Sequence, residues 1–144
     1  MKINPLISTE KVKELLPQKA PFVMVHDLLK YNEEEITTGF LIEKDNIFIE
    51  NGFLNESGLI ENVAQTTALH TSYSYYIKNK TAPVGYIAQI QNTKIENFPN
   101  IGDYITTTVK ILAEFDDITL VNGEAKFQDK ILIQTRMKTY LAKS

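Results

Sequence analysis

The chain has 144 residues, 43% of them apolar, and no cysteine. This length and composition predict a single domain over residues 1–144 with a core large enough to fold unaided. The formal charge of −3 is spread over 15 basic and 18 acidic residues without long like-charge blocks, which argues against nucleic acid or a membrane as the partner. The absence of cysteine and of an apolar secretion signal leads us to expect a cytoplasmic protein.

The first elements are short. A capping Ser8 or Thr9 precedes a periodic stretch that Pro17 ends, which predicts a helix of one to two turns. Residues 22–29 and 36–42 are rich in apolar and β-branched side chains and flank a charged turn, so they predict two paired strands. Several asparagines and Gly52 predict an irregular connection over 45–57.

A long helix follows. Residues 58–77 are mostly apolar or small, and Glu61 is the only carboxylate among them. The stretch is about long enough to span a bilayer, but its amides, hydroxyls and His70 would be costly in lipid. We therefore predict a buried soluble helix from about Ser57 to Lys78 or Lys80.

The remaining chain predicts four strands, over 84–91, 104–115, 118–127 and 131–141, joined in an antiparallel meander. In the second of them, alternation places six side chains on one face: Ile105, Thr107, Val109, Ile111, Ala113 and Phe115. A helix that is apolar nearly all round needs a sheet curved around it, and an exposed edge strand invites a second subunit. The expected fold is α+β, with a long central helix wrapped by an antiparallel sheet of about five to six strands, and a dimer is the expected assembly.

Glu61 is the best candidate for chemistry, because an ionised carboxylate buried without a partner costs several kcal/mol. Gln65 lies one turn further on the same helix face and could orient Glu61, whereas Asn62 is turned roughly 100° away. Near the start of the helix, Gly58 would admit a ligand close to free amide N–H groups. Taken locally, Glu61 could equally be a structural residue that caps a neighbouring loop.

Three segments together resemble one family, the hotdog-fold 3-hydroxyacyl-[acyl-carrier-protein] dehydratases of fatty-acid synthesis and their relatives in polyene biosynthesis. Residues 16–25, LPQKAPFVMV, resemble its N-terminal signature, and residues 58–65, GLIENVAQ, resemble the signature of its central helix. Residues 94–103, KIENFPNIGD, resemble the basic residue and Pro-Gly-Asp turn before its fourth strand. The similarity covers most of the chain in matching order.

The resemblance implies a hotdog fold and a hydro-lyase that acts on acyl thioesters of acyl carrier protein or coenzyme A, with no cofactor and no metal. It assigns Glu61 the role of the catalytic acid. In the family, a histidine in the loop before the helix removes the proton on C2, and the two residues come from different subunits of a dimer. The chain departs from this pattern, because residues 46–57 contain no histidine. We expect His26 and His70 to be structural residues.

Three functions remain open. The first is a dehydratase in which Glu61 is catalytic and Gln65, Gly58, Asn51, Phe53 and Asn62 contact the substrate. The second is a non-catalytic hotdog subunit that pairs with an active homologue, so that both a homodimer and a heterodimer are possible. The third is an acyl-thioester hydrolase, in which Asn51 or Asn55 would act with Glu61.

Overall fold

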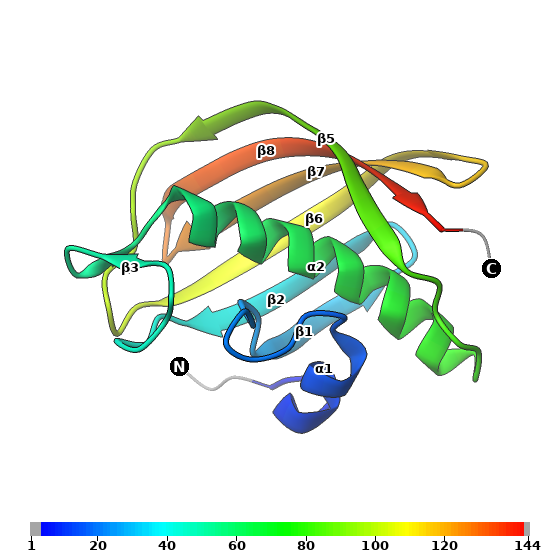
Figure 1. Ribbon diagram of the computed structural model, residues 1–144, viewed down its shortest axis with the longest axis horizontal. Coiled ribbons are helices and arrows are strands. Elements are labelled where there is room, and N and C mark those ends of the chain that lie inside the picture. The colour runs from blue at the N-terminus through cyan, green and yellow to red at the C-terminus, as the bar shows by residue number, and fades with distance from the viewer. Residues whose placement is uncertain (1–3, 143–144) are drawn as a thin grey trace.

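The computed structural model describes residues 4–142 and contains two α-helices and eight strands in that range (Figure 1). In chain order the elements are α1 (Thr9–Leu15), β1 (Asp27–Asn32), β2 (Glu35–Leu41), β3 (Ile49–Glu50), β4 (Phe53–Leu54), α2 (Glu56–Ile77), β5 (Gly85–Ile95), β6 (Tyr104–Phe115), β7 (Ile118–Phe127) and β8 (Lys130–Leu141). No helix within this range is long and apolar enough to cross a membrane.

Six strands form one antiparallel sheet in the order β1-β2-β6-β7-β8-β5. The sheet curves around α2, which lies along its concave face (Figure 1). We call this face the inner face and the opposite one the outer face. The arrangement is the expected hotdog fold, and its six strands confirm the predicted number.

The helix lies close to the sheet because Gly123 on β7 has no side chain. A Cβ atom at Gly123 would be 2.4 Å from Cγ1 of Val63 on α2. Real Cβ atoms do not approach other atoms so closely, so this helix position requires glycine beneath it. Val63 itself is fully buried and belongs to a core formed by α2 and the inner face.

Strand β1 begins at Asp27, so the strand predicted over 22–29 is wrong in its first half. The reason lies in the hydrogen-bond partners of the backbone in residues 22–24. Phe22 O and both backbone polar groups of Met24 bond to amide side chains of α2 instead of to a neighbouring strand. The segment is apolar because Met24 and Val25 enter the core, while Phe22 remains 53% exposed.

The single face predicted for β6 is interrupted by a bulge. The pairing with β7 shifts between Ile111 and Ala113. Before the shift, Val109 lies opposite Gly123 on the inner face, whereas after it Phe115 lies opposite Ile118 on the outer face. Alternation continues along the sequence, but the extra residue turns Ala113 and Phe115 to the other side of the sheet.

The connection predicted to be irregular contains the hairpin β3–β4. Its turn is Asn51-Gly52, with both residues at positive φ, 52° and 86°. This is the backbone of the two-residue turn that Asn-Gly favours. The hairpin leads directly into α2.

Strand β5 forms one edge of the sheet, and all of its residues except Gln91 and Ile95 are exposed. Ile87 and Ile90 point to the inner face, as their partners Thr139 and Met137 on β8 do, yet they are 41% and 42% exposed. The helix therefore leaves this edge of the inner face uncovered.

Candidate functional site

Glu61 lines a pocket of about 390 Å³ between α2, the end of α1 and the start of β5. The helix contributes small side chains to it, which follow Glu61 along one face: Ala64, Thr67, Ala68, Thr71 and Ser72. The opposite walls are residues 14–19, 82–87, Thr139 and Leu141. From Glu61 to Ser72 the helix rises about 16 Å, so the pocket lining extends over about that length of the helix.

The predicted pair of Glu61 and Gln65 is formed. Gln65 Nε2 donates a hydrogen bond to Glu61 Oε2 at 2.7 Å, and the same nitrogen donates to Phe22 O at 2.7 Å. Gln65 Oε1 accepts a hydrogen bond from Met24 N, also at 2.7 Å. The amide is thus held in one orientation by the backbone, and it holds one oxygen of Glu61. Glu61 Oε1 accepts no hydrogen bond from a described residue.

Asn62 faces the sheet and not the pocket. Its Nδ2 donates to Met24 O at 2.8 Å, and its Oδ1 accepts from the Thr107 hydroxyl at 2.5 Å. The side chain is fully buried. Asn62 and Gln65 therefore hold both backbone polar groups of Met24, which fixes the segment next to Glu61.

Gly58 lies in the first turn of α2, where its N–H donates to the side chain of Asn55 at 3.0 Å. A Cβ atom at Gly58 would be 2.5 Å from Cδ1 and 2.7 Å from Cγ of Leu54. Close packing against β4 thus requires glycine at this position. The N–H is used by the helix cap, and Gly58 is not among the residues that line the Glu61 pocket.

Asn51 and Phe53 belong to the β3–β4 hairpin. Asn51 is exposed in its turn, and the Phe53 ring lies 5.1 Å from that of Phe98. Neither residue lines the Glu61 pocket. Of the predicted site residues, the structure therefore brings together Glu61 and Gln65, and places Asn51, Phe53, Gly58 and Asn62 elsewhere around the helix start.

His26 has both ring nitrogens occupied. Nδ1 accepts a hydrogen bond from Leu41 N at 3.1 Å, and Nε2 lies 3.4 Å from Glu43 Oε1. Burial lowers the pKa of His26, and the Glu43 carboxylate opposes this in part. The residue lines a different hollow, of about 490 Å³, that does not include Glu61.

His70 is buried against β1. Its Nε2 lies 2.9 Å from Asn32 O and must be the donor, because a carbonyl oxygen only accepts. Burial lowers the pKa of His70, and the bond to Asn32 opposes this shift. Neither histidine is among the residues that line the Glu61 pocket.

Sequence reasoning missed most of the walls of this pocket. The signal on the helix was the repeat of small side chains at Ala64, Ala68 and Ser72, spaced by four residues beyond Glu61. Such a repeat keeps one helix face low and leaves room beside it. The walls from residues 14–19 and 82–87 are contributed by tertiary packing, which no local pattern reports.

Comparison with known proteins gives consistent matches. The model of a family described as "ApeP-like: ApeP dehydratase" matches residues 10–144. A 3-hydroxyacyl-[acyl-carrier-protein] dehydratase FabZ from Legionella pneumophila is 25% identical over 139 residues, covering 90% of each chain. Among solved structures, the dehydratase heterocomplex ApeI:P from Xenorhabdus doucetiae matches with a TM-score of 0.85 at 16% identity, covering 92% of this chain and 91% of that one. Zebra fish thioesterase superfamily member 2 has the same fold, with a TM-score of 0.71 at 16% identity over 94% and 99% of the two chains.

Proposed function

The chain belongs to the ApeP-like dehydratase family, and from this premise we propose that it is the glutamate-donating subunit of a two-chain dehydratase. The substrate would be a 3-hydroxyacyl thioester carried by acyl carrier protein, as the names of the FabZ relatives suggest. The second chain would be a related hotdog subunit with a catalytic histidine. We also propose that the protein acts in the cytoplasm. The chain has no cysteine and so does not use the disulfide bonds that are typical of secreted proteins and rare in cytosolic ones.

The observation that carries this proposal is a pocket with an oriented carboxylate and no histidine among its described lining residues. Dehydration of a 3-hydroxyacyl thioester breaks the C2–H and C3–O bonds, forms the C2=C3 double bond and releases water. One group must take the C2 proton while another gives a proton to the departing hydroxyl. We assign the second task to Glu61 and the first to an imidazole of the partner.

The edge strand supports a partner of the same fold. Strand β5 has exposed backbone groups along the edge that does not pair with β8. Such an edge pairs readily with a strand of another chain. Ile87 and Ile90 would be covered by the inner face of the partner, beside the Glu61 pocket. The ApeI:P structure is described as a heterocomplex, which supports two different chains over two copies of one.

The acyl chain would lie along α2. Small side chains on the helix and the apolar walls Leu15, Leu16 and Ile87 suit a hydrocarbon chain. Gln65 would not touch the substrate in this proposal, since all its polar atoms are used within the chain. It would be a positioning residue for Glu61.

The test is the purified complex of this chain with a histidine-bearing hotdog dehydratase subunit. Enoyl thioester formation and free thiol release are followed separately with a 3-hydroxyacyl carrier-protein substrate. Glu61→Gln should lower dehydration by about 10²-fold or more, the usual contribution of a general acid. The matched control is Glu56→Gln, the same change at an exposed position of the first turn of α2, which should leave the rate unchanged.

Each other outcome contradicts the proposal in its own way. Full activity of the complex with Glu61→Gln would make this chain a non-catalytic partner. Dehydration by this chain alone would remove the need for a histidine from the second chain. Thiol release without enoyl formation would identify a thioester hydrolase.

A further inference from the structure

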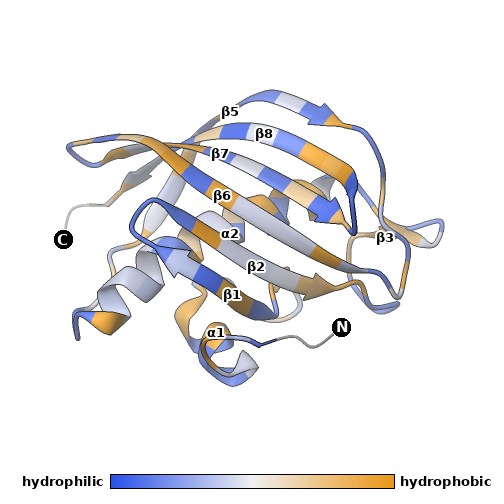
Figure 2. Cartoon of the chain, turned by 180° about the vertical axis from the view of Figure 1, so that it is seen from behind, coloured by the Kyte–Doolittle hydropathy of each residue, from blue (hydrophilic) through white to orange (hydrophobic). Residues whose placement is uncertain are grey.

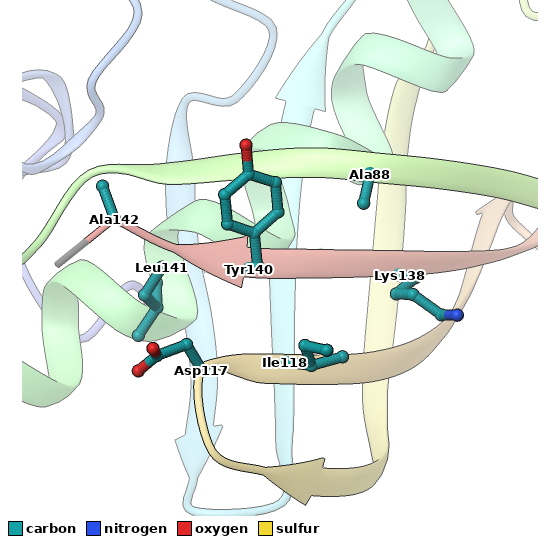
Figure 3. Close-up of a pocket in the computed structure, with 7 residues that line it drawn as sticks. All are labelled: Ala88, Asp117, Ile118, Lys138, Tyr140, Leu141 and Ala142. Atoms are coloured by element: carbon teal, nitrogen blue, oxygen red, sulfur yellow. The ribbon is translucent and has the colours of Figure 1, made fainter.

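Leu141 stands between two hollows of the structure. It lines the Glu61 pocket of about 390 Å³ and also a second hollow, of about 450 Å³, at the outer face of the sheet. Among the described residues, only Leu141 lines both. Figure 3 shows it at the end of β8 beside Asp117, with Tyr140 and Ile118 of the second hollow further along the strands. One side chain therefore separates the pocket proposed for the acyl chain from the outer hollow.

Leu141 lies at the end of the pocket that is furthest from Glu61. Glu61 is near the start of α2, whereas Leu141 pairs with Gly85 at the start of β5, which a short connection over 78–84 joins to the end of α2 (Figure 1). Leu141 points to the inner face, as Thr139 two residues earlier does, and both line the pocket. Figure 2 shows this end of the sheet from the outer side.

The backbone at Leu141 is held from both sides. The N–H of Leu141 donates to Asp117 O at 2.9 Å, and the N–H of Ala142 donates to Val84 O at 2.8 Å. The side chain lies against Gly85, because a Cβ atom added at Gly85 would be 3.5 Å from Cδ2 of Leu141. The end of β8 therefore cannot move aside for a longer ligand without breaking these hydrogen bonds, and the leucine side chain closes this end of the pocket.

We propose that Leu141 is a specificity-determining residue, which sets the longest acyl chain that this subunit accepts. The pocket lining on α2 extends over about 16 Å from Glu61 to Ser72. With C–C bonds of about 1.5 Å, an extended hydrocarbon advances about 1.3 Å per carbon, so about twelve carbons fit beyond the one that reacts beside Glu61. A longer chain would meet the Leu141 side chain. That an acyl chain occupies the pocket rests on the proposed function, whereas the closure follows from the position of Leu141.

The test is calorimetric titration of saturated acyl-coenzyme A thioesters into the purified two-chain complex, in a series that lengthens by two carbons at a time. These ligands lack the 3-hydroxyl group, so their binding is measured without turnover. The affinity should rise by up to about fourfold for each buried CH₂ until the chain reaches Leu141, and should rise no further for longer chains. We call the chain length at which the rise stops the length limit.

Two variants should move the length limit in opposite directions. Leu141→Ala opens the pocket to the outer hollow, so the limit should move to a chain about two carbons longer or more. Gly85→Val adds a side chain against Leu141 and should move the limit to a chain about two carbons shorter. Gly85 is not at positive φ, so its backbone accepts valine. The matched control is Leu112→Ala, the same change at a leucine of β6 that is 48% exposed and lines neither hollow, and it should leave the limit unchanged.

An unchanged length limit in both variants would overturn the role of Leu141, as would an equal shift with Leu112→Ala. Size-exclusion chromatography checks that each variant assembles, and if Leu141→Ala does not, Gly85→Val decides, since it removes no packed side chain. Dehydration of a short 3-hydroxyacyl thioester by the same samples tests the proposed function separately. If this dehydration depends on Glu61 while neither variant moves the limit, only the closure by Leu141 is wrong. If the limit moves as expected but no dehydration occurs, the closure stands and the proposed function is wrong.

Discussion

Replacing Asn62 by alanine should destabilise the chain because two buried groups lose their partner. Asn62 bonds to Met24 O and to the Thr107 hydroxyl, and all three residues are fully buried. A buried polar group left without a hydrogen bond costs about 1–3 kcal/mol, and alanine returns about 0.7 kcal/mol through its better helix propensity. The expected net loss for the two groups is about 1–5 kcal/mol, against the roughly 5–15 kcal/mol that stabilises a domain.

The assay is urea unfolding at one fixed protein concentration, with the midpoint lowered and the slope unchanged. A double-mutant cycle with Thr107→Val tests the mechanism. Thr107→Val should lower the free energy of unfolding less in the Asn62→Ala background than in the wild type, because the hydrogen bond to Asn62 is already absent there. We expect a coupling of about 0.5–3 kcal/mol. A loss below about 0.5 kcal/mol in Asn62→Ala, or strictly additive effects in the cycle, would refute the reasoning that this amide holds the Met24 segment against the helix.

Two further changes follow from the structure. Gly123→Ala should lower the free energy of unfolding in urea by about 1–3 kcal/mol, since the new Cβ would be 2.4 Å from Cγ1 of Val63. In a Val63→Ala background the same change should cost less, because the clashing side chain is shorter. Equal losses in both backgrounds would contradict the clash. Because the pKa of His70 is lowered in the folded chain, the unfolded chain takes up a proton on this residue at a higher pH than the folded chain does. The contribution of His70 to stability is therefore present above about pH 6.5 and is lost as pH falls through the pKa of the folded state. His70→Gln, compared with wild type by unfolding across this range, should flatten the pH dependence; an unchanged slope would show that other groups cause it.

The sequence predicted the helices, most strands and the long wrapped helix because these depend on local periodicity. It failed where an element is defined by distant atoms. Phe22–Met24 has the composition of a strand, but its hydrogen-bond partners are side chains about forty residues away on α2. The bulge in β6 left no local mark at all.

The hairpin before α2 is a different kind of failure, since its signal was present. Asn51-Gly52 is the strongest short-range hairpin dipeptide, whereas the prediction for 45–57 uses it only as one of several turn formers. For the site, Glu61 stood out as a lone charge in an apolar helix, and its pairing with Gln65 followed from their spacing. That Asn62 and Gln65 are used inside the chain could not follow from the sequence, because the groups they bind come from other elements.

If the proposed partner covers the exposed edge strand β5, the amount of this protein in a cell would depend on the amount of that partner. A subunit whose edge is covered only in a complex gains stability by mass action, so its unfolding midpoint should rise with partner concentration. A chain made in excess would keep a long open edge and be a preferred substrate for chaperones and proteases. The stoichiometry of the complex would then be set by degradation of the surplus subunit as much as by the rates at which the two chains are synthesised.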